Sequence, residues 1–338
     1  MRRIKMAKVE KRIINVNVKN IREFNLPYWE VDSGREGPCF LLTAALHGCE
    51  VIGCDVMRRF LPVAARDLVR GKILLLPFSN PPAVWNRRHN LYSSPSEPKG
   101  FGKDNINGAW PGKADGHEVE QIAFIINEKL VKESTHNIDM HCWSRFNVAC
   151  AVPDDESKQV EFAMAAALPA VHVISRGPAA KREYYTLSGY FNATDRLSFS
   201  MEFSGQYMLS ERESELGVRM LSNCSRYIGI FEGDPEGTDE PSIFFNDKTP
   251  RAEVKAPAGG LFVENGLKPG DIVARGDLLG ILFMDDSLDI LEIKAPESGM
   301  LYSYGCHRRM ADVDLAAQHP YADRDGLLAT IIPTVRRT

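Results

Sequence analysis

Residues 39–50 read CFLLTAALHGCE, and this stretch indicates the class of fold most clearly. The first eight form a short, almost continuous apolar run that ends in His47 and Gly48. Such a run is typical of a strand buried on both faces, as in a parallel sheet. Open α/β sheets bind their ligands at the carboxyl ends of these strands. The stretch therefore predicts a parallel strand that leads directly into a functional site.

Strand-like and helical patterns alternate along the following 160 residues or so. Helical spacing of apolar residues occurs at 51–61 and 118–131, and a polar loop is expected at about 79–116. Further strands are predicted at residues 73–77, 137–142, 171–174 and 197–203. This alternation of strands and helices favours an α/β domain with a mostly parallel sheet flanked by helices.

The pattern changes after about residue 250, where short strands with glycine turns replace the helices. Residues 256–262, 268–282 and 293–301 resemble the half-motifs of a lipoyl or biotinyl-type barrel sandwich. We therefore predict an α/β domain over residues 1–250 and a smaller all-β domain over 251–338. A carrier domain would hold a modified lysine at its hairpin tip, but the corresponding DDSLD stretch contains none, which favours a covering or assembly role.

Composition excludes several classes of protein. The 338 residues are 44% hydrophobic, enough for about two domains with a sizeable core. Lys and Arg (41) nearly balance Asp and Glu (45), and a net charge of −4 gives no indication of nucleic-acid binding. No apolar run reaches the roughly 18 residues of a membrane helix. Seven cysteines without a C-x-x-C pattern suggest reduced thiols, so we expect a cytoplasmic protein, with a homo-oligomer possible on general grounds.

The chemistry is expected around His47 and Glu50. A histidine and a carboxylate three residues apart can face one centre, and both groups suit Zn²⁺. A catalytic zinc takes a third protein ligand and keeps one position for water. His141 is the natural candidate, because it also ends a predicted strand, and Asp139 lies two residues back on the same strand face as a hydrogen-bond partner.

Glu202 stands in the apolar stretch FSMEFSG at residues 199–205. An unpaired buried charge is costly, so a glutamate in this position needs a reason. A catalytic role is one, and a buried ion pair with an arginine is the other.

Together these motifs resemble the succinylglutamate desuccinylase/aspartoacylase family, a branch of the M14 zinc carboxypeptidases. The resemblance covers the chain from about Phe40 to the C-terminus. It implies a zinc-carboxypeptidase-like mixed sheet with a small C-terminal β domain. It also implies one Zn²⁺ per chain, held by His47, Glu50 and His141, with Glu202 as the general base.

The resemblance extends to substrate-binding segments. The family's Asn-Pro pair and its carbonyl-polarising arginine match Asn80 and then Arg87 or Arg88. Its N-L-N-R-x-F-P-G segment matches residues 105–112, with Asn107 as a substrate contact. Gly108 replaces the arginine that would grip a substrate carboxylate in a bidentate contact. Recognition of a free carboxylate there is therefore in doubt.

The implied activity is metal-assisted hydrolysis of the amide bond of a small N-acyl amino acid or related compound. Carboxypeptidase and esterase activities at the same site are alternatives, and Gly108 weakens the first of them. A non-catalytic binding protein on the same fold is a further alternative.

Three groups are weaker candidates. Cys49 and Cys142 flank expected ligands but fit packing better. Trp110 and Trp143 either line the pocket or pack in the core. The segment 176–185, which holds two arginines and two tyrosines, supplies substrate contacts or is a solvated loop.

Overall fold

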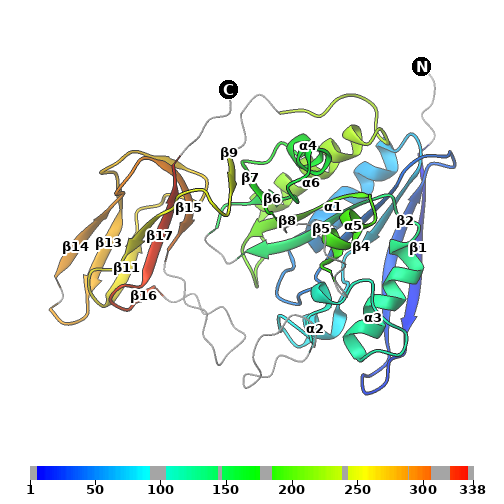
Figure 1. The fold of residues 1–338 in the computed structure, drawn as a ribbon, viewed down its shortest axis with the longest axis horizontal. Coiled ribbons are helices and arrows are strands. Elements are labelled where there is room, and N and C mark those ends of the chain that lie inside the picture. Colours follow the sequence, from blue (N-terminus) through cyan, green and yellow to red (C-terminus); the bar gives the residue numbers. More distant parts are fainter. Residues whose placement is uncertain are drawn as a thin grey trace.

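The structure is a computed structural model of the chain (Figure 1). It describes residues 6–91, 104–143, 147–175, 185–237, 243–287, 289–305 and 320–333.

A nine-stranded mixed sheet forms the centre of the larger part, in the order β1-β2-β4-β3-β5-β8-β6-β7-β9. Four central strands, β4, β3, β5 and β8, run parallel to one another, while β6 is antiparallel to β8. The strands are β1 (Lys8–Val16), β2 (Phe24–Asp32), β3 (Cys39–Ala44), β4 (Lys72–Leu76), β5 (His136–Trp143), β6 (Cys150–Val152), β7 (Ala170–Val173), β8 (Leu197–Ser204) and β9 (Ile243–Asn246). The predicted parallel strands and the mixed α/β fold are confirmed.

The antiparallel hairpin of β1 and β2 was not predicted. It adds to the sheet through β2, which pairs with β4. The first half of its outer strand carries charged side chains, namely Lys8, Glu10, Lys11 and Arg12. Charged side chains on an edge strand hinder pairing with other chains, which explains the polar pattern.

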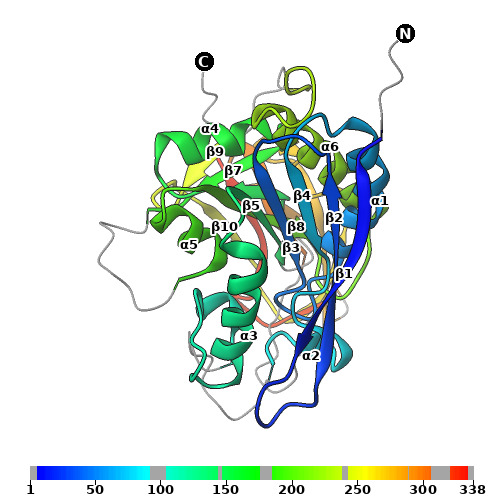
Figure 2. The ribbon, with the colours of Figure 1, turned by 90° about the vertical axis from the view of Figure 1, so that its right-hand side faces the viewer.

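Helices cover both faces of the sheet (Figure 2). Helices α1, α4 and α6 pack on one face and α3 and α5 on the other. They are α1 (Ile52–Asp67), α2 (Pro81–Trp85), α3 (Glu118–Ile126), α4 (Ser157–Ala165), α5 (Leu187–Ala193) and α6 (Glu211–Tyr227), with a 3-10 turn η1 (Ile106–Gly108) and a π-helical turn η2 (Asn127–Val131). The segment 79–116, which was expected to be a polar loop, therefore contains α2 and η1. Helix α2 forms there because Asn80 caps its first turn and prolines occupy its first positions.

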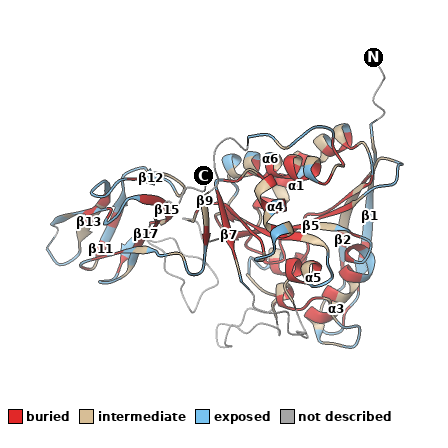
Figure 3. Ribbon diagram, turned by 45° about the horizontal axis from the view of Figure 1, so that its top comes forward, coloured by how far each residue is buried: buried red, intermediate tan, exposed pale blue. Residues whose placement is uncertain are grey.

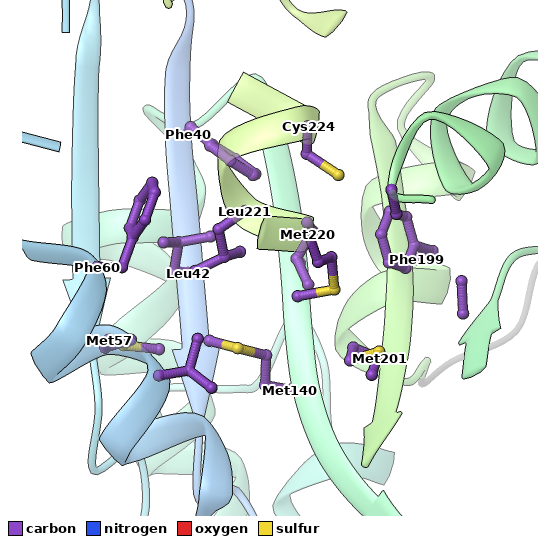
Figure 4. Close-up of a cluster of buried hydrophobic side chains, with 14 of the residues drawn as sticks. Phe40, Leu42, Met57, Phe60, Met140, Phe199, Met201, Met220, Leu221 and Cys224 are labelled. Atoms are coloured by element: carbon purple, nitrogen blue, oxygen red, sulfur yellow. The ribbon is translucent and has the colours of Figure 1, made fainter. Parts of the chain in front are cut away.

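The main core lies between the central strands and the helices α1, α4 and α6 (Figures 3 and 4). Alternate residues of each strand point into it, such as Met140 of β5 and Met201 of β8. The intervening residues of both strands face α5 on the opposite side. The candidate functional site includes polar residues of β5 and β8 on that opposite face.

Strand β3 lies at the point where the chain changes direction across the sheet. Helix α1 leads from β3 to β4 on one side, and β5 pairs with β3 on the other. The carboxyl ends of β3 and β5 therefore form a topological switch point, where open sheets bind ligands.

Two four-stranded antiparallel sheets follow, in the orders β10-β17-β15-β12 and β14-β13-β11-β16. Their strands are β10 (Ala252–Lys255), β11 (Gly260–Glu264), β12 (Ile272–Val273), β13 (Leu278–Met284), β14 (Ile290–Lys294), β15 (Gly299–Tyr304), β16 (Tyr321–Ala322) and β17 (Leu327–Ile332). The predicted all-β C-terminal part is confirmed, and it has its own core. The division of the chain at residue 250 stays a prediction.

The C-terminal sheets also share a hydrophobic cluster with the larger sheet. Tyr302 and Met300 of β15 pack there with Cys150 of β6 and with Phe245 of β9. The Val148 N–H donates to the Tyr302 carbonyl at 2.8 Å. None of the helices in the described ranges is long and apolar enough to cross a membrane.

Candidate metal centre

The site begins with a tight turn at the end of β3. The Glu50 N–H donates to the His47 carbonyl at 3.1 Å, which brings both side chains to the same side of the chain. His47 Nδ1 lies 3.1 Å from Glu50 Oε2. The pair therefore faces one centre from a turn that precedes α1.

His141 and Glu202 lie side by side on the neighbouring strands β5 and β8. Each is flanked in sequence by residues of the opposite, apolar face, such as Met140 and Met201. This alternation directs Asp139, His141 and Glu202 to one face of the sheet. The parallel register thus brings the predicted base beside the predicted ligand.

The Glu50 carboxylate is the centre of the group. Its Oε2 atom lies 3.1 Å from His47 Nδ1 and 2.8 Å from His141 Nδ1. Its Oε1 atom lies 3.5 Å from His89 Nε2 and accepts a hydrogen bond from Gln206 Nε2 at 3.3 Å. Although burial disfavours the carboxylate, His47 and His141 hold the pKa of Glu50 well below its usual range.

Hydrogen bonds indicate which nitrogen of His47 carries the proton. Asn105 Oδ1 accepts the Asn107 N–H at 2.9 Å, so it is also an acceptor for the His47 Nε2–H at 3.0 Å. His47 Nδ1 is then a lone pair that faces a carboxylate oxygen. This atom is buried and forms no hydrogen bond within the described residues. Burial also lowers the pKa of His47, which favours the neutral, metal-binding imidazole.

His141 is held in the same way from inside the sheet. Its Nε2 lies 2.7 Å from Asp139 Oδ2, and the other Asp139 oxygen accepts the Thr43 hydroxyl at 2.7 Å. Carboxylate–histidine pairs of this kind orient metal-binding imidazoles. Burial disfavours the imidazolium, but Asp139 and Glu50 outweigh it and raise the pKa of His141 well above its usual value. A bound cation can replace the proton that these carboxylates attract.

The donor set therefore fits a divalent metal. Two imidazole nitrogens meet one oxygen of Glu50, and the unpartnered Nδ1 of His47 lacks the proton that would satisfy it. Nitrogen and carboxylate donors in this number are those of a catalytic zinc site.

Glu202 has the character of a general base. Burial raises its pKa to about 8; the nearby Glu50 and Asp139 add to the effect, and His141 opposes it. No hydrogen bond or ion pair joins Glu202 to another described residue, so no arginine partner is found in this part of the chain. A carboxyl group with a pKa near neutrality is suited to accepting and returning protons.

The two arginines and the asparagine that were predicted to bind substrate follow β4 and differ in exposure. Arg87 and Arg88 are exposed on the turn that follows α2, and Arg87 has a left-handed backbone (φ 54°). Asn80 is buried; its Oδ1 accepts the Ala83 N–H at 3.4 Å and its Nδ2–H donates to the Leu46 carbonyl at 3.0 Å. The oxygen and the nitrogen of the Asn80 side-chain amide thus fasten α2 to the end of β3, and the substrate roles of all three residues stay predictions.

Asn107 lies beside the metal centre. Its Oδ1 accepts the Leu187 N–H at 3.0 Å, so its amide nitrogen points toward His141 Nε2, 3.2 Å away. Gly108 is buried in the η1 turn. The substrate contact predicted for Asn107 stays a prediction.

The sequence reasoning missed His89 and Gln206. The ligand atoms of His47, Glu50 and His89 all lie within 4.8 Å of one another. His89 directly follows the two predicted arginines, but no local pattern distinguishes it from a surface histidine. Gln206 follows β8, and its side chain also donates to the Cys142 carbonyl at 3.0 Å. Only the approach of three loops to β5 brings these residues together.

The weaker candidates are mostly structural. Trp110 is fully buried in the core beneath α3 and α5, and Trp143 packs on the cluster shared with the C-terminal sheets. Cys49 and Cys142 are buried and form no disulfide within the described part of the chain. Of the segment 176–185, only Tyr185 falls within the described residues.

Comparison with known proteins gives a consistent result. A family model described as the succinylglutamate desuccinylase/aspartoacylase catalytic domain matches residues 36–228. N-alpha-acetyl-L-2,4-diaminobutyric acid deacetylase of Halomonas elongata is 23% identical over 274 residues, which cover 79% of this chain and 77% of that protein.

Solved structures show the same fold over nearly the whole chain. An aspartoacylase family protein from Mesorhizobium loti has a TM-score of 0.70 at 20% identity, covering 99% of this chain and 97% of that one. The ectoine utilization protein EutE from Ruegeria pomeroyi, with product bound, has a TM-score of 0.68 at 19% identity, covering 98% and 97%. The C-terminal sheets are therefore part of the shared architecture.

Proposed function

Because the chain belongs to the succinylglutamate desuccinylase/aspartoacylase family, we propose that it is a zinc-dependent deacylase. In this proposal it hydrolyses the amide bond of a small N-acyl amino acid or related N-acyl compound. His47, Glu50 and His141 hold the zinc, and Glu202 is the general base.

One observation carries the proposal: the Nδ1 atoms of two buried imidazoles face the same carboxylate oxygen of Glu50, at 3.1 Å for His47 and 2.8 Å for His141. Each has its other nitrogen bonded to an oxygen acceptor, Asn105 for His47 and Asp139 for His141. His47 Nδ1 forms no hydrogen bond within the described residues, whereas a purely structural cluster would be expected to place a proton between this atom and the carboxylate.

The residues of the chain have separate tasks in the reaction. Zinc bound there would act as a Lewis acid toward a carbonyl and lower the pKa of a water molecule. Glu202 accepts a proton from the attacking water and returns it to the leaving nitrogen. Asp139 keeps the His141 ring in its metal-binding orientation. Asn107 offers its amide to the substrate beside His141, and Arg87 or Arg88 is the proposed carbonyl-polarising group.

N-acetylated amino acids are the first substrates to test. The relative from Halomonas elongata is named for deacetylation of an N-acetylated diamino acid. A cytoplasmic location and a homo-oligomer stay predictions.

The test combines metal analysis with hydrolysis. Purified wild type should contain about one zinc per chain and release acetate from an N-acetyl diamino acid or another member of an N-acyl amino acid panel. Glu202→Gln should keep its zinc but lose roughly 10² to 10⁴ in rate. Glu211→Gln, on the exposed start of α6, is the matched control and should retain full activity. Near-normal hydrolysis by Glu202→Gln, or a wild type that binds no zinc, would overturn the proposal.

A further inference from the structure

We propose that Gln206 is a positioning residue for the metal ligand Glu50. Its side-chain amide holds one carboxylate oxygen of Glu50 away from His47 and His141, so that the other oxygen stays between them. The inference rests on the ligand role of Glu50 in the proposed function and goes beyond it, because none of the roles that the resemblance implies falls on Gln206.

The turn after β8 brings Gln206 to the site. Gln206 stands four residues after Glu202, and Gly205 between them has a φ of 125°, a conformation that glycine adopts more readily than other residues. The N–H of the next residue, Tyr207, donates to the Cys49 carbonyl at 2.8 Å. The backbone of this turn is therefore fastened to the tight turn at the end of β3.

The orientation of the Gln206 amide follows from its two partners. Its Nε2 atom donates to the Cys142 carbonyl at 3.0 Å and to Glu50 Oε1 at 3.3 Å. A carbonyl and a carboxylate oxygen only accept hydrogen bonds, so the nitrogen of the amide must face them. An amide nitrogen carries two hydrogens, and these two bonds use both. One side chain thus connects the turn after β8, the end of β5 and Glu50.

The Glu50 carboxylate needs such an outer partner. The last torsion of a glutamate side chain is broad, so the chain itself does not fix which oxygen faces the histidines. Glu50 Oε2 lies 3.1 Å from His47 Nδ1 and 2.8 Å from His141 Nδ1, whereas Oε1 accepts the Gln206 amide. His89 Nε2 lies 3.5 Å from the same Oε1, a longer contact. Gln206 therefore selects the oxygen that remains for the metal.

Burial makes this contact important. The Glu50 side chain is only 4% exposed, so bulk water does not readily replace a lost donor at Oε1. Without the amide, the carboxylate would be free to turn away from His47 and His141. The same amide ties Glu50 to the segment that carries the proposed base Glu202, so the spacing of ligand and base depends on it as well. Gln206 acts through Glu50 and is not itself catalytic.

The zinc affinity of the folded, full-length protein tests the proposal without reference to activity. Gln206→Met keeps the length of the side chain but has no N–H group. It should bind zinc about 10- to 100-fold more weakly than wild type in competition with a chromophoric chelator. Gln121→Met is the matched control, because Gln121 of α3 also donates to a backbone carbonyl, that of Gly116, outside the candidate site. It should bind zinc as wild type does.

A merely structural role for Gln206 gives a different result. Loss of the bond to the Cys142 carbonyl alone would lower the free energy of unfolding but leave the zinc affinity of the folded protein unchanged. Equal zinc affinity in wild type and Gln206→Met would therefore overturn the proposal and leave the proposed function standing. A wild type that binds no zinc contradicts both. Gln206→Asn, whose amide is one methylene shorter, carries the same test if Gln206→Met does not fold.

Cobalt substitution gives a spectroscopic readout. Co²⁺ bound in place of zinc absorbs visible light, and its spectrum reports the arrangement of the ligand atoms. The spectrum should change in Gln206→Met, because the Glu50 carboxylate turns, and should match wild type in Gln121→Met. Identical spectra of wild type and Gln206→Met would show that the carboxylate keeps its orientation without the amide, which contradicts the proposal.

Discussion

The two sides of the candidate metal centre are built by different means. The inner side consists of Asp139, His141 and Glu202, which project from the paired strands β5 and β8. The outer side is the turn after α2, where Arg87 and Arg88 are exposed and His89 alone reaches Glu50. Strand pairing fixes the direction of every second side chain, whereas the outer side depends on one close backbone contact at Gly48. The inner side is therefore held in place by the pairing of β5 with β8, and the outer side by packing against Gly48.

Gly48→Ala should have the largest effect, because it separates the outer side from the inner one. The added Cβ meets backbone atoms at 2.2 to 2.5 Å, so the turn after α2 must move. We expect a loss of about 3 kcal/mol or more in the free energy of unfolding, within the range of severe steric changes. Urea unfolding of the metal-free protein measures it.

Gly233→Ala is the control for this substitution. Residue 233 has a positive φ of 87°, but a Cβ there meets no atom within 4 Å. It should cost only the strain of that backbone conformation, about 1 to 2 kcal/mol. Equal losses in the two variants would show that the approach at Gly48 is not tight.

Glu202→Gln tests the inner side through the pH dependence of stability. Burial raises the pKa of Glu202 from an ordinary 4.5 to about 8, so folding of the metal-free protein favours the protonated carboxyl. Its contribution is complete below pH 4.5 and is lost as the pH rises through 8. The glutamine variant lacks this loss, so its stability advantage should grow by about 1 kcal/mol per pH unit between these values.

Chemical unfolding of both proteins at pH 5, 6.5 and 8 measures that advantage. Glu211→Gln, with its exposed side chain, should show no growing difference from wild type. A constant gap between wild type and Glu202→Gln would mean that the carboxyl is not desolvated.

Asp139→Asn should weaken zinc binding by about 10- to 100-fold, because Asp139 orients the His141 ring from a fully buried position. Chelator competition provides the measurement. Ser200→Ala, on the same face of β8 but bonded to Ser188, is a control that should bind zinc normally. An unchanged affinity in Asp139→Asn would show that β5 alone orients the ring.

Asn90→Ala should have the smallest effect. It removes the hydrogen bond to His89 Nδ1, but the stacking on His47 and the backbone bond from Gly48 remain. A hydrogen bond of this kind contributes about 0.5 to 1.5 kcal/mol to the free energy of unfolding, so Asn90→Ala should be only slightly less stable than wild type. Urea unfolding of the metal-free protein measures the difference, and a loss larger than that of Gly48→Ala would reverse the comparison of the two sides.

The same contrast explains what the sequence predicted. The central strands β3, β4, β5 and β8, and with them His47, His141 and Glu202, follow from apolar runs that end in polar residues. Strand periodicity carries that information locally. His89 and Gln206 were missed because their places depend on contacts between loops distant in sequence. The β1–β2 hairpin was missed because its charged outer strand shows little alternation.

The hydrophobic cluster shared by β6 and β15 bears on how this chain varies in evolution. Cys150 of β6 lies opposite Glu202 in the sheet and, on its other side, packs in one cluster with Tyr302 and Met300. One short strand thus separates the proposed catalytic base from the C-terminal sheets. A C-terminal part exchanged from a distant relative would bring an unmatched surface to that strand, so we expect the two halves of the gene to be inherited together and to change in step.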